Sequence, residues 1–360
     1  AANVKPVKVI TRPDQYVGVT TYTGNGGTQS IETGHKFDFV WIKTRSGSGN
    51  HHIFDVVRGV NKSLHSDTNA STETTTAGLT SFDSNGFSIG NSNNDINGNG
   101  ITFVSWNWKA GGSKNTFNVD DVGYASAAAA GLTGGTITPT GASVGTKQGF
   151  SIIKFTNTTS DSTQSHGLTQ KPDFIIWKKT SGTSHWPVYH SSLGATKYTY
   201  LNLTNAASTG SEFWNNTEPT SSVVTTKGEP NSMGSAGDTI MYLWHDVPGL
   251  QKFGKYTGNQ DADGPFIELG FRPKLIICKG IDDAEDWYIR DTTRSPYNEV
   301  NKSLRPNDDG AEYSGREIDI LSNGFKLRTA DTQVNQSTKS YLYAAWAEAP
   351  TFNLYGAQSN

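Results

Sequence analysis

Three blocks of eight residues repeat one pattern of apolar and polar positions. They are KFDFVWIK at 36–43, KPDFIIWK at 171–178 and RPKLIICK at 272–279. In each block a basic residue opens, two residues intervene, four apolar residues follow and a lysine closes. A short continuous apolar run that ends at a charge is typical of a strand buried on both faces. We therefore expect a central strand at each of these places.

A second recurring segment, rich in β-branched and aromatic residues, leads each time to a tryptophan and then to glycine or proline. The segments are TFVSWNWKAGG at 102–112, TIMYLWHDVPG at 239–249 and SYLYAAWAEAP at 340–350. This composition predicts a final strand that carries a large aromatic side chain. Between the central and final strands, SNGF at 84–87 and 322–325 predicts a hairpin with a two-residue Asn-Gly turn that has positive φ at both positions.

Two further short segments occur twice, in the same order along the chain. VNKSL stands at 60–64 and 300–304, and YTGN stands at 22–25 and 256–259. Internal similarity at a nearly constant spacing indicates duplicated units, here with a more diverged third copy between the other two. A unit of about 95–100 residues has the size of a β-sandwich of seven or eight strands.

We therefore predict an all-β protein made of three tandem antiparallel β-sandwich repeats of a jelly-roll or lectin-like kind. The expected parts are an N-terminal extension at 1–15, repeats at 16–112, 149–250 and 251–350, a linker at 113–148 and a C-terminal tail at 351–360. The linker is expected because its side chains are mostly small, with one short helical turn at 127–130. At 360 residues the chain is too long for one ordinary core, so each repeat is expected to fold alone.

Composition narrows the class of partner. The 30 basic and 33 acidic residues nearly balance, so no nucleic acid and no membrane surface is expected as a partner. No apolar run reaches the roughly 18–20 residues of a membrane span, and no signal peptide is recognisable, so a soluble chain is expected. The first residue is not methionine, which suggests trimming or a fragment of a longer polypeptide. The single cysteine, Cys278, excludes an internal disulfide and is expected to be a buried apolar thiol.

The segments YTGNGG, FDFVWIK, IFDVVRGVNKSL, GLTSFDSNGFSIG and FVSWNWKAGG together resemble a repeat domain of bacteriophage virion appendage proteins, especially tail-fibre-like proteins of marine phages. The resemblance covers nearly the whole chain outside the expected linker and is weakest in the middle copy, where SVVTTKGEP replaces the SNGF pattern. It implies a structural or adhesive part at the virion surface, outside the cell. It also implies assembly with other virion proteins and with itself, as a trimer in the case of a fibre, and it implies no catalytic residues.

Three aligned positions, Asp55, His190 and Asp291, are the first candidates for chemistry. An aspartate or histidine in this place could act as a general acid or base. The alternative is structural, because Asp55 and Asp291 each precede an arginine by three residues, at Arg58 and Arg294. The middle copy has lost both partners together, which favours structural ion pairs that order a loop.

Metal sites find little support in the sequence. His51 and His52 are adjacent, so on a strand they point to opposite faces and cannot bind one ion together. DINGNG at 95–100 resembles the start of a calcium loop, but its twelfth position is Trp106 instead of a glutamate. We expect turns at 95–100 and at DADG, residues 261–264. No metal or cofactor is predicted, and calcium has only this weak support.

One aromatic group in the middle copy exceeds what the repeat pattern requires. It consists of Tyr198, Tyr200, Phe213 and Trp214. Aromatic rings beside polar residues fill cores and subunit interfaces, and they also stack on sugar rings. Packing or subunit contact and contact with a host-surface glycan are therefore the two alternatives for these side chains.

These observations predict a structural phage protein rather than an enzyme. A tail-fibre-like or spike-like appendage would attach to the host surface through several weak sites at once. One alternative is a non-adhesive capsid or tail decoration whose surfaces are used in assembly. Another is a depolymerase of surface polysaccharide, which needs two carboxylates facing across a groove. No G-x-S-x-G, HExxH or Walker sequence is present.

Overall fold

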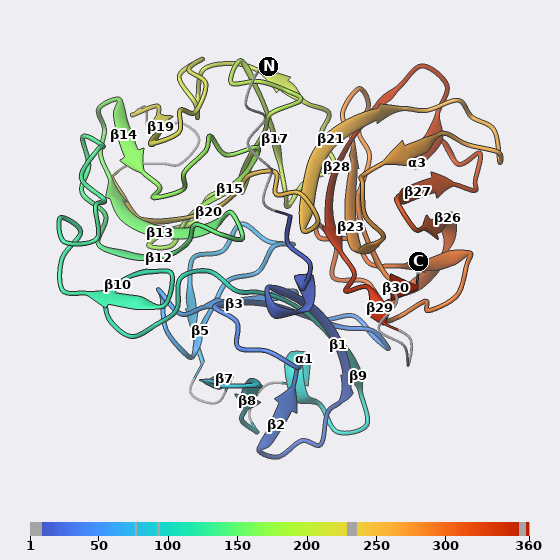
Figure 1. Cartoon of the computed structure of the whole chain (residues 1–360), viewed down its shortest axis with the longest axis horizontal. Helices are drawn as coiled ribbons and strands as arrows, with labels where there is room; N and C mark the ends of the chain where they lie inside the picture. The colour runs from blue at the N-terminus through green and yellow to red at the C-terminus, as the bar shows by residue number, and fades with distance from the viewer. Residues whose placement is uncertain (1–8, 76–77, 92–93, 229–235, 353–357, 360) are drawn as a thin grey trace.

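Three groups of strands surround a common centre (Figure 1). The computed structural model describes residues 9–75, 78–91, 94–228, 236–352 and 358–359. We call the groups the first lobe (strands within 17–108), the second lobe (117–244) and the third lobe (251–347). The described chain is all-β with several antiparallel sheets. Its α-helices are single turns, α1 (Asn94–Asn97) and α3 (Thr332–Asn335), and a short 3-10 helix, η1 (Pro13–Gln15), precedes the first strand.

The same four-stranded antiparallel arrangement occurs in each lobe. The orders are β1-β9-β3-β4, β13-β20-β15-β16 (inside a nine-stranded sheet) and β21-β28-β23-β24. These strands are β1 (Val17–Thr23), β3 (Phe39–Thr44), β4 (His52–Asp55), β9 (Thr102–Trp108), β13 (Phe150–Asn157), β15 (Phe174–Lys179), β16 (Pro187–His190), β20 (Gly237–Trp244), β21 (Gln251–Thr257), β23 (Pro273–Gly280), β24 (Trp287–Asp291) and β28 (Ser340–Ala347). The predicted central strands β3, β15 and β23 each pair with the last strand of their lobe, and their apolar runs are buried.

A smaller layer of strands covers the outer face of each arrangement. The orders are β2-β8-β7 in the first lobe, β14-β19 in the second and β22-β27-β26-β25 in the third, with a separate β5-β6 pair in the first. These strands are β2 (Gln29–Glu32), β5 (Lys62–Ser63), β6 (Glu73–Thr74), β7 (Leu79–Asp83), β8 (Gly86–Ile89), β14 (Ser162–Ser165), β19 (Val223–Thr226), β22 (Phe266–Glu268), β25 (Val300–Ser303), β26 (Tyr313–Leu321) and β27 (Gly324–Leu327). Each lobe therefore encloses a core of its own. Near the C-terminus, β29 (Thr351–Phe352) pairs with β30 (Gln358–Ser359).

The segment 113–148 is not a linker, because it adds strands to the sheet of the second lobe. The added strands are β10 (Phe117–Val119), β11 (Val122–Tyr124) and β12 (Gly141–Gly145) beside β13, while β17 (Lys197–Tyr200) and β18 (Ser208–Thr209) extend the opposite edge. The small residues serve close packing, since a Cβ on Gly135 would lie 2.5 Å from the carbonyl oxygen of Thr163. The expected helical turn is present, with Ala130 N donating to Ser126 O at 3.1 Å.

Both predicted SNGF hairpins form, but the predicted turn is wrong. Asp83 pairs with Gly86 in the first hairpin and Leu321 pairs with Gly324 in the second, so serine and asparagine occupy the turn. Neither of these asparagines has positive φ. The glycine is required by a close approach instead, because a Cβ on Gly86 would lie 1.9 Å from the carbonyl oxygen of Ile31 on β2.

The repeated YTGN segment fastens the single-turn helix of its lobe to the first strand. In the first lobe Tyr22 OH donates to Ile96 O at 2.7 Å, and Asn25 N donates to Asn97 Oδ1 at 3.1 Å. The corresponding bonds of the third lobe are Tyr256 OH to Val334 O at 2.8 Å and Asn259 N to Asn335 Oδ1 at 2.9 Å. Identical sequence segments thus make the same local contacts in two lobes.

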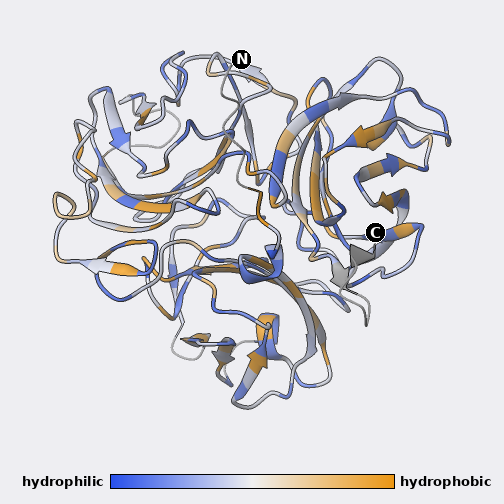
Figure 2. Cartoon of the chain, viewed as in Figure 1, coloured by the Kyte–Doolittle hydropathy of each residue, from blue (hydrophilic) through white to orange (hydrophobic). Residues whose placement is uncertain are grey.

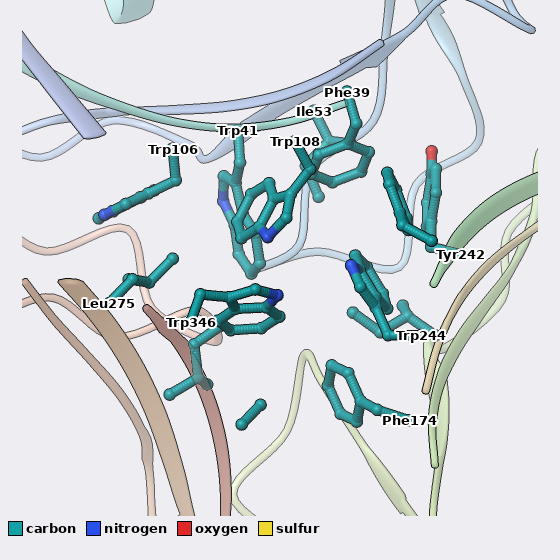
Figure 3. Packing of buried hydrophobic residues seen from close by; sticks show 14 of the residues in the cluster. Phe39, Trp41, Ile53, Trp106, Trp108, Phe174, Tyr242, Trp244, Leu275 and Trp346 are labelled. Atoms are coloured by element: carbon teal, nitrogen blue, oxygen red, sulfur yellow. The ribbon is translucent and has the colours of Figure 1, made fainter. Parts of the chain in front are cut away.

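The inner faces of the three arrangements share one hydrophobic core. Trp108, Trp244 and Trp346, from the three final strands, meet edge to face there with ring centroids 5.2, 6.1 and 6.2 Å apart (Figure 3). Side chains alternate along a strand. Every second residue of each central strand therefore faces this shared core, and the residues between them face the core of their own lobe. In Figure 2 hydrophobic residues accordingly lie along the strands, while the outer loops are mostly hydrophilic. A lobe taken alone would expose its inner face to water.

Hydrogen bonds join the lobes in a closed cycle. They are Trp186 Nε1 to Thr68 O at 2.9 Å, Trp287 Nε1 to Tyr200 O at 2.8 Å, and His51 Nε2 to Arg305 O at 2.9 Å. Two of the lysines that close the predicted blocks are buried at the same boundaries. Lys178 Nζ donates to Asn69 O at 3.0 Å and Lys279 Nζ donates to Thr204 O at 2.8 Å. Each lobe therefore contacts the other two.

Candidate functional site

The predicted ion pairs are present and close two equivalent turns. Arg58 Nε lies 2.5 Å from Asp55 Oδ2, and Arg294 Nε lies 2.6 Å from Asp291 Oδ2. In the first lobe the second carboxylate oxygen, Asp55 Oδ1, accepts the backbone N–H groups of Val57 and Arg58 at 3.0 and 2.8 Å. All four charged side chains are buried. Charge-assisted bonds of this kind are short and strong, so each carboxylate holds its turn in place.

The same three aligned positions also connect neighbouring lobes. Asp55 Oδ2 accepts from Tyr242 OH at 2.8 Å, Asp291 Oδ2 accepts from Trp106 Nε1 at 3.0 Å, and His190 Nε2 bonds the carbonyl oxygen of Tyr343 at 3.1 Å. Burial lowers the pKa of His190 to about 4, so its ring is neutral at pH 7. Its Nδ1 accepts from Ser192 N, which leaves the proton on Nε2. These groups are used in contacts between lobes.

The structure separates the two alternatives for the aromatic group of the second lobe. Phe213 and Trp214 are 0% and 1% exposed, and Tyr198 is 9% exposed. The rings of Phe213 and Trp214 lie 6.2 and 5.9 Å from that of Trp177 on the central strand, and the half-buried ring of Tyr200 lies 5.8 Å from Phe213. The alternative in which Phe213 and Trp214 form a surface for stacking on a sugar is therefore wrong. They fill the core that the long second sheet encloses with its small covering layer.

His51 and His52 point in opposite directions, as the strand geometry predicts. His51 Nδ1 accepts from Trp41 Nε1 at 2.8 Å, whereas His52 Nδ1 bonds Ser63 Oγ at 2.9 Å. Burial lowers the pKa of both rings. Within the described ranges, no three His, Cys, Asp or Glu side chains are grouped so that they could hold a metal ion. Asp95, Ile96 and Asn97 of the DINGNG segment lie in α1, and Asn97 accepts a hydrogen bond from the YTGN segment.

A surface cavity of about 550 Å³ lies where the N-terminal segment crosses the end of the second lobe. Its lining comes from four separate parts of the chain, including Ile10, Arg12, Gln15 and Tyr16, then Thr146 and Lys147, then Gln170, and finally His245, Asp246, Val247 and Pro248. A hydrogen bond of 3.0 Å from Ile10 N to Pro248 O holds the segment against the lobe. The volume falls within the range of small-molecule sites.

The cavity combines flat apolar surface with hydrogen-bonding groups. Tyr16, Val247 and Pro248 supply the apolar part, and Lys147 and Gln170 are exposed at its rim. This combination fits a polar ligand with an apolar face, such as a sugar residue, which has an apolar ring face and many hydroxyl groups.

The acid–base groups of the cavity are limited. Burial raises the pKa of Asp246 to about 6, and Asp246 Oδ1 accepts from Phe253 N at 2.8 Å. Burial lowers the pKa of His245, whose Nδ1 bonds the carbonyl oxygen of Asp246 at 2.8 Å. Asp246 is the single carboxylate among the described lining residues. Sequence reasoning missed this cavity, because no repeated segment marks it and its four parts meet only in the folded chain.

Comparison with known proteins identifies a family for the chain but no curated relative. No curated protein matches the chain. Among the residues that the structure describes, no helix is long and apolar enough to cross a membrane. The model of a family described as a domain of unknown function (DUF7483) matches residues 12–350 and so covers all three lobes. The chain belongs to the DUF7483 family.

Proposed function

We propose that this protein is a structural virion protein of a bacteriophage, a tail-fibre-like or spike-like appendage that attaches to the host surface. On this proposal the lobes are three tandem antiparallel β-sandwich repeats of one duplicated unit. The resemblance of the repeated segments supports the virion role, and the matching strand orders in the lobes support the duplication. The chain would assemble with itself, as a trimer, and with other virion proteins.

The observation that carries the proposal is the shared tryptophan core. Trp108, Trp244 and Trp346 lock the lobes together, and the buried polar groups at Asp55, His190 and Asp291 add bonds between neighbouring lobes. A close-packed core of this kind makes the folded chain rigid. A rigid subunit holds its outer loops in fixed positions for weak binding to a surface, and several such contacts in an oligomer raise avidity.

The cavity beside Tyr16 is the candidate for host contact, with a sugar residue of a surface polysaccharide as its ligand. We would measure binding of the purified chain to an array of bacterial surface polysaccharides. Lys147→Glu and Gln170→Ala should each weaken binding at least tenfold, because both side chains are exposed at the rim. Lys114→Glu, a matched charge change at an exposed position away from the cavity, should leave binding unchanged. Equal loss in all three variants would contradict this site.

A non-adhesive decoration protein is the second candidate. It is favoured by the burial of Phe213 and Trp214, which removes the sugar platform that the sequence suggested. Labelled antibodies on whole particles would locate the chain, and native mass measurement would give its oligomeric state. Incorporation into particles without binding to any polysaccharide would support decoration over attachment. A depolymerase is less favoured, because the cavity offers one carboxylate among its described residues where hydrolysis needs two.

A further inference from the structure

Asp246 differs from the residues at the same position of the other two lobes. The last tryptophan of each lobe pairs with an equivalent residue of the central strand, so Asp246, two residues further on, corresponds to Ala110 and Glu348. Glu348 forms ion pairs with Arg272 and Lys274, with N···O distances of 2.7 and 3.4 Å. Asp246 forms no ion pair with any described residue. Neither the repeated pattern nor a counter-charge therefore accounts for its carboxylate.

The two oxygen atoms of the Asp246 side chain lie in different surroundings. Oδ1 accepts the backbone N–H of Phe253 at 2.8 Å. Oδ2 has no hydrogen-bond partner among the described residues, yet it is not enclosed as Nε2 of the neighbouring His245 is. Asp246 lines the cavity of about 550 Å³ beside Tyr16, so Oδ2 is the carboxylate atom that a ligand in this cavity can reach.

The charges around Asp246 favour a positively charged group beside it. Asp173 Oδ2 accepts the backbone N–H of Asp246 at 2.9 Å, which brings a second carboxylate close to the first. Burial and the charge of Asp173 raise the pKa of Asp246 to about 6, while the charge of Lys252 acts in the opposite direction. At pH 7 the half-buried Asp246 is therefore mostly ionised and lacks a cation. A partly buried charge without a partner is unfavourable, so binding a cation there would be favourable.

The basic side chains that line the cavity do not neutralise Asp246. Arg12 is held by Asp14 through two hydrogen bonds, at 2.9 and 2.7 Å. Burial lowers the pKa of His245, so its ring is neutral at pH 7. Lys147 is exposed at the rim and has no partner among the described residues, so its Nζ is available to donate to an oxygen atom of a ligand.

We propose that Asp246 selects an amino sugar as the ligand of this cavity, with a free ammonium group at Asp246 Oδ2 and a sugar oxygen at Lys147 Nζ. An ammonium group donates hydrogen bonds to the carboxylate and also balances its charge, whereas a hydroxyl group only donates. The apolar face of the sugar ring would lie on Tyr16, Val247 and Pro248. This inference rests on the proposed function, because it names the class of sugar bound at the same site.

Calorimetric titration of the whole chain at pH 7 would test the inference, with oligosaccharides of glucosamine and of galactosamine as probes. The N-acetylated form of each oligosaccharide is the matched ligand, because acetylation removes the charge and keeps the ring. The wild type should bind at least one amino form about tenfold tighter than its acetylated form, since hydrogen bonds to charged groups are the stronger ones. Equal or tighter binding of the acetylated forms, or no binding of either amino form, would overturn the inference.

Two substitutions make the test specific. Asp246→Asn removes the charge and keeps an oxygen atom that can accept from Phe253 N, so the local fold should be retained. This variant should lose the preference for the amino form, whereas Glu32→Gln, which removes an exposed carboxylate from β2, should keep it. Below pH 6 the wild type should bind the amino form more weakly, by up to about tenfold per pH unit, as Asp246 takes up a proton. A preference or a loss at low pH that persists in Asp246→Asn would overturn the inference.

Failure of this inference can be distinguished from failure of the proposed function. Binding to an array polysaccharide that is weakened by Gln170→Ala, without any preference for an amino form, would overturn the inference and leave the proposed function in place. Binding of an amino form that depends on Asp246, without binding to any surface polysaccharide, would support the inference and contradict attachment to the host.

Discussion

Replacing Trp244 with alanine tests whether the three lobes depend on one core. Trp244 is 2% exposed, and its ring lies 6.3 Å from Phe39 of the first lobe, 5.6 Å from Phe174 of the second and 6.1 Å from Trp346 of the third. Loss of a buried tryptophan costs about 3–5 kcal/mol, partly through the cavity that remains. The surrounding side chains belong to three separate sheets that cannot collapse inward easily, so we expect the upper end of this range.

Urea unfolding followed by far-UV circular dichroism would measure the free energy, and hydrogen exchange would show where the loss is felt. Trp244→Ala should speed exchange in β3 and β28, which belong to the other two lobes, as well as in β20. Trp214→Ala is the matched control, because Trp214 is equally buried but contacts rings of the second lobe, at Trp177, Tyr189 and Phe213. It should speed exchange in the second lobe and leave β3 and β28 protected.

The reasoning is refuted if Trp244→Ala leaves exchange in β3 and β28 at wild-type rates. A loss confined to the second lobe would mean that each lobe is stabilised by its own core and that the tryptophan contacts between lobes contribute little. A free-energy change below about 1 kcal/mol would lead to the same conclusion, because it would be smaller than the expected cost of the cavity.

Three further outcomes follow from buried polar groups and close backbone contacts. Asp55→Asn leaves the buried Arg58 without its counter-charge and should cost about 3–5 kcal/mol in urea unfolding, while Asp14→Asn, at an exposed pair, should cost less than about 1 kcal/mol. Gly86→Ala places a Cβ 1.9 Å from Ile31 O and should cost about 1–3 kcal/mol, whereas Gly47→Ala, with open space around it, should be nearly neutral; equal effects would contradict the close approach. Burial lowers the pKa of Lys178 to about 7 in the folded chain. Above pH 7 the unfolded chain therefore binds more protons than the folded chain, and the free energy of unfolding should rise with pH. This lysine contributes at most about 1.4 kcal/mol per pH unit to the rise. Lys178→Met should reduce the rise in the urea midpoint between pH 7 and pH 9, and an unchanged rise would show that Lys178 is not its cause.

Several features of the fold could be predicted because they depend on nearest neighbours along the chain. The apolar runs at 39–42, 174–177 and 275–278 form buried strands, since a continuous run of apolar side chains leaves neither face of a strand for water. The spacing of three residues between Asp55 and Arg58 allows the ion pair within one turn. Local patterns of this kind act before any long-range contact is made.

The exceptions arise where the partner lies far away in sequence. Small residues at 113–148 read as a linker, but their size allows other backbone segments to approach closely, and a single chain does not show what approaches. Phe213 and Trp214 read equally well as surface or core, because aromatic rings stabilise both. The cavity beside Tyr16 and the unpaired charge of Asp246 have no local signal at all.

The sequence by itself determined the all-β class, the recurring strand pattern and the ion pairs within turns, because side-chain alternation and short spacings set them. Only the tertiary structure decided that Trp108, Trp244 and Trp346 meet in one core and that Asp246 lines a cavity without a counter-charge. Burial depends on which faces of distant strands pack together. A strand pattern specifies that a face is apolar, and the surface that covers it is chosen by the packing of the whole chain.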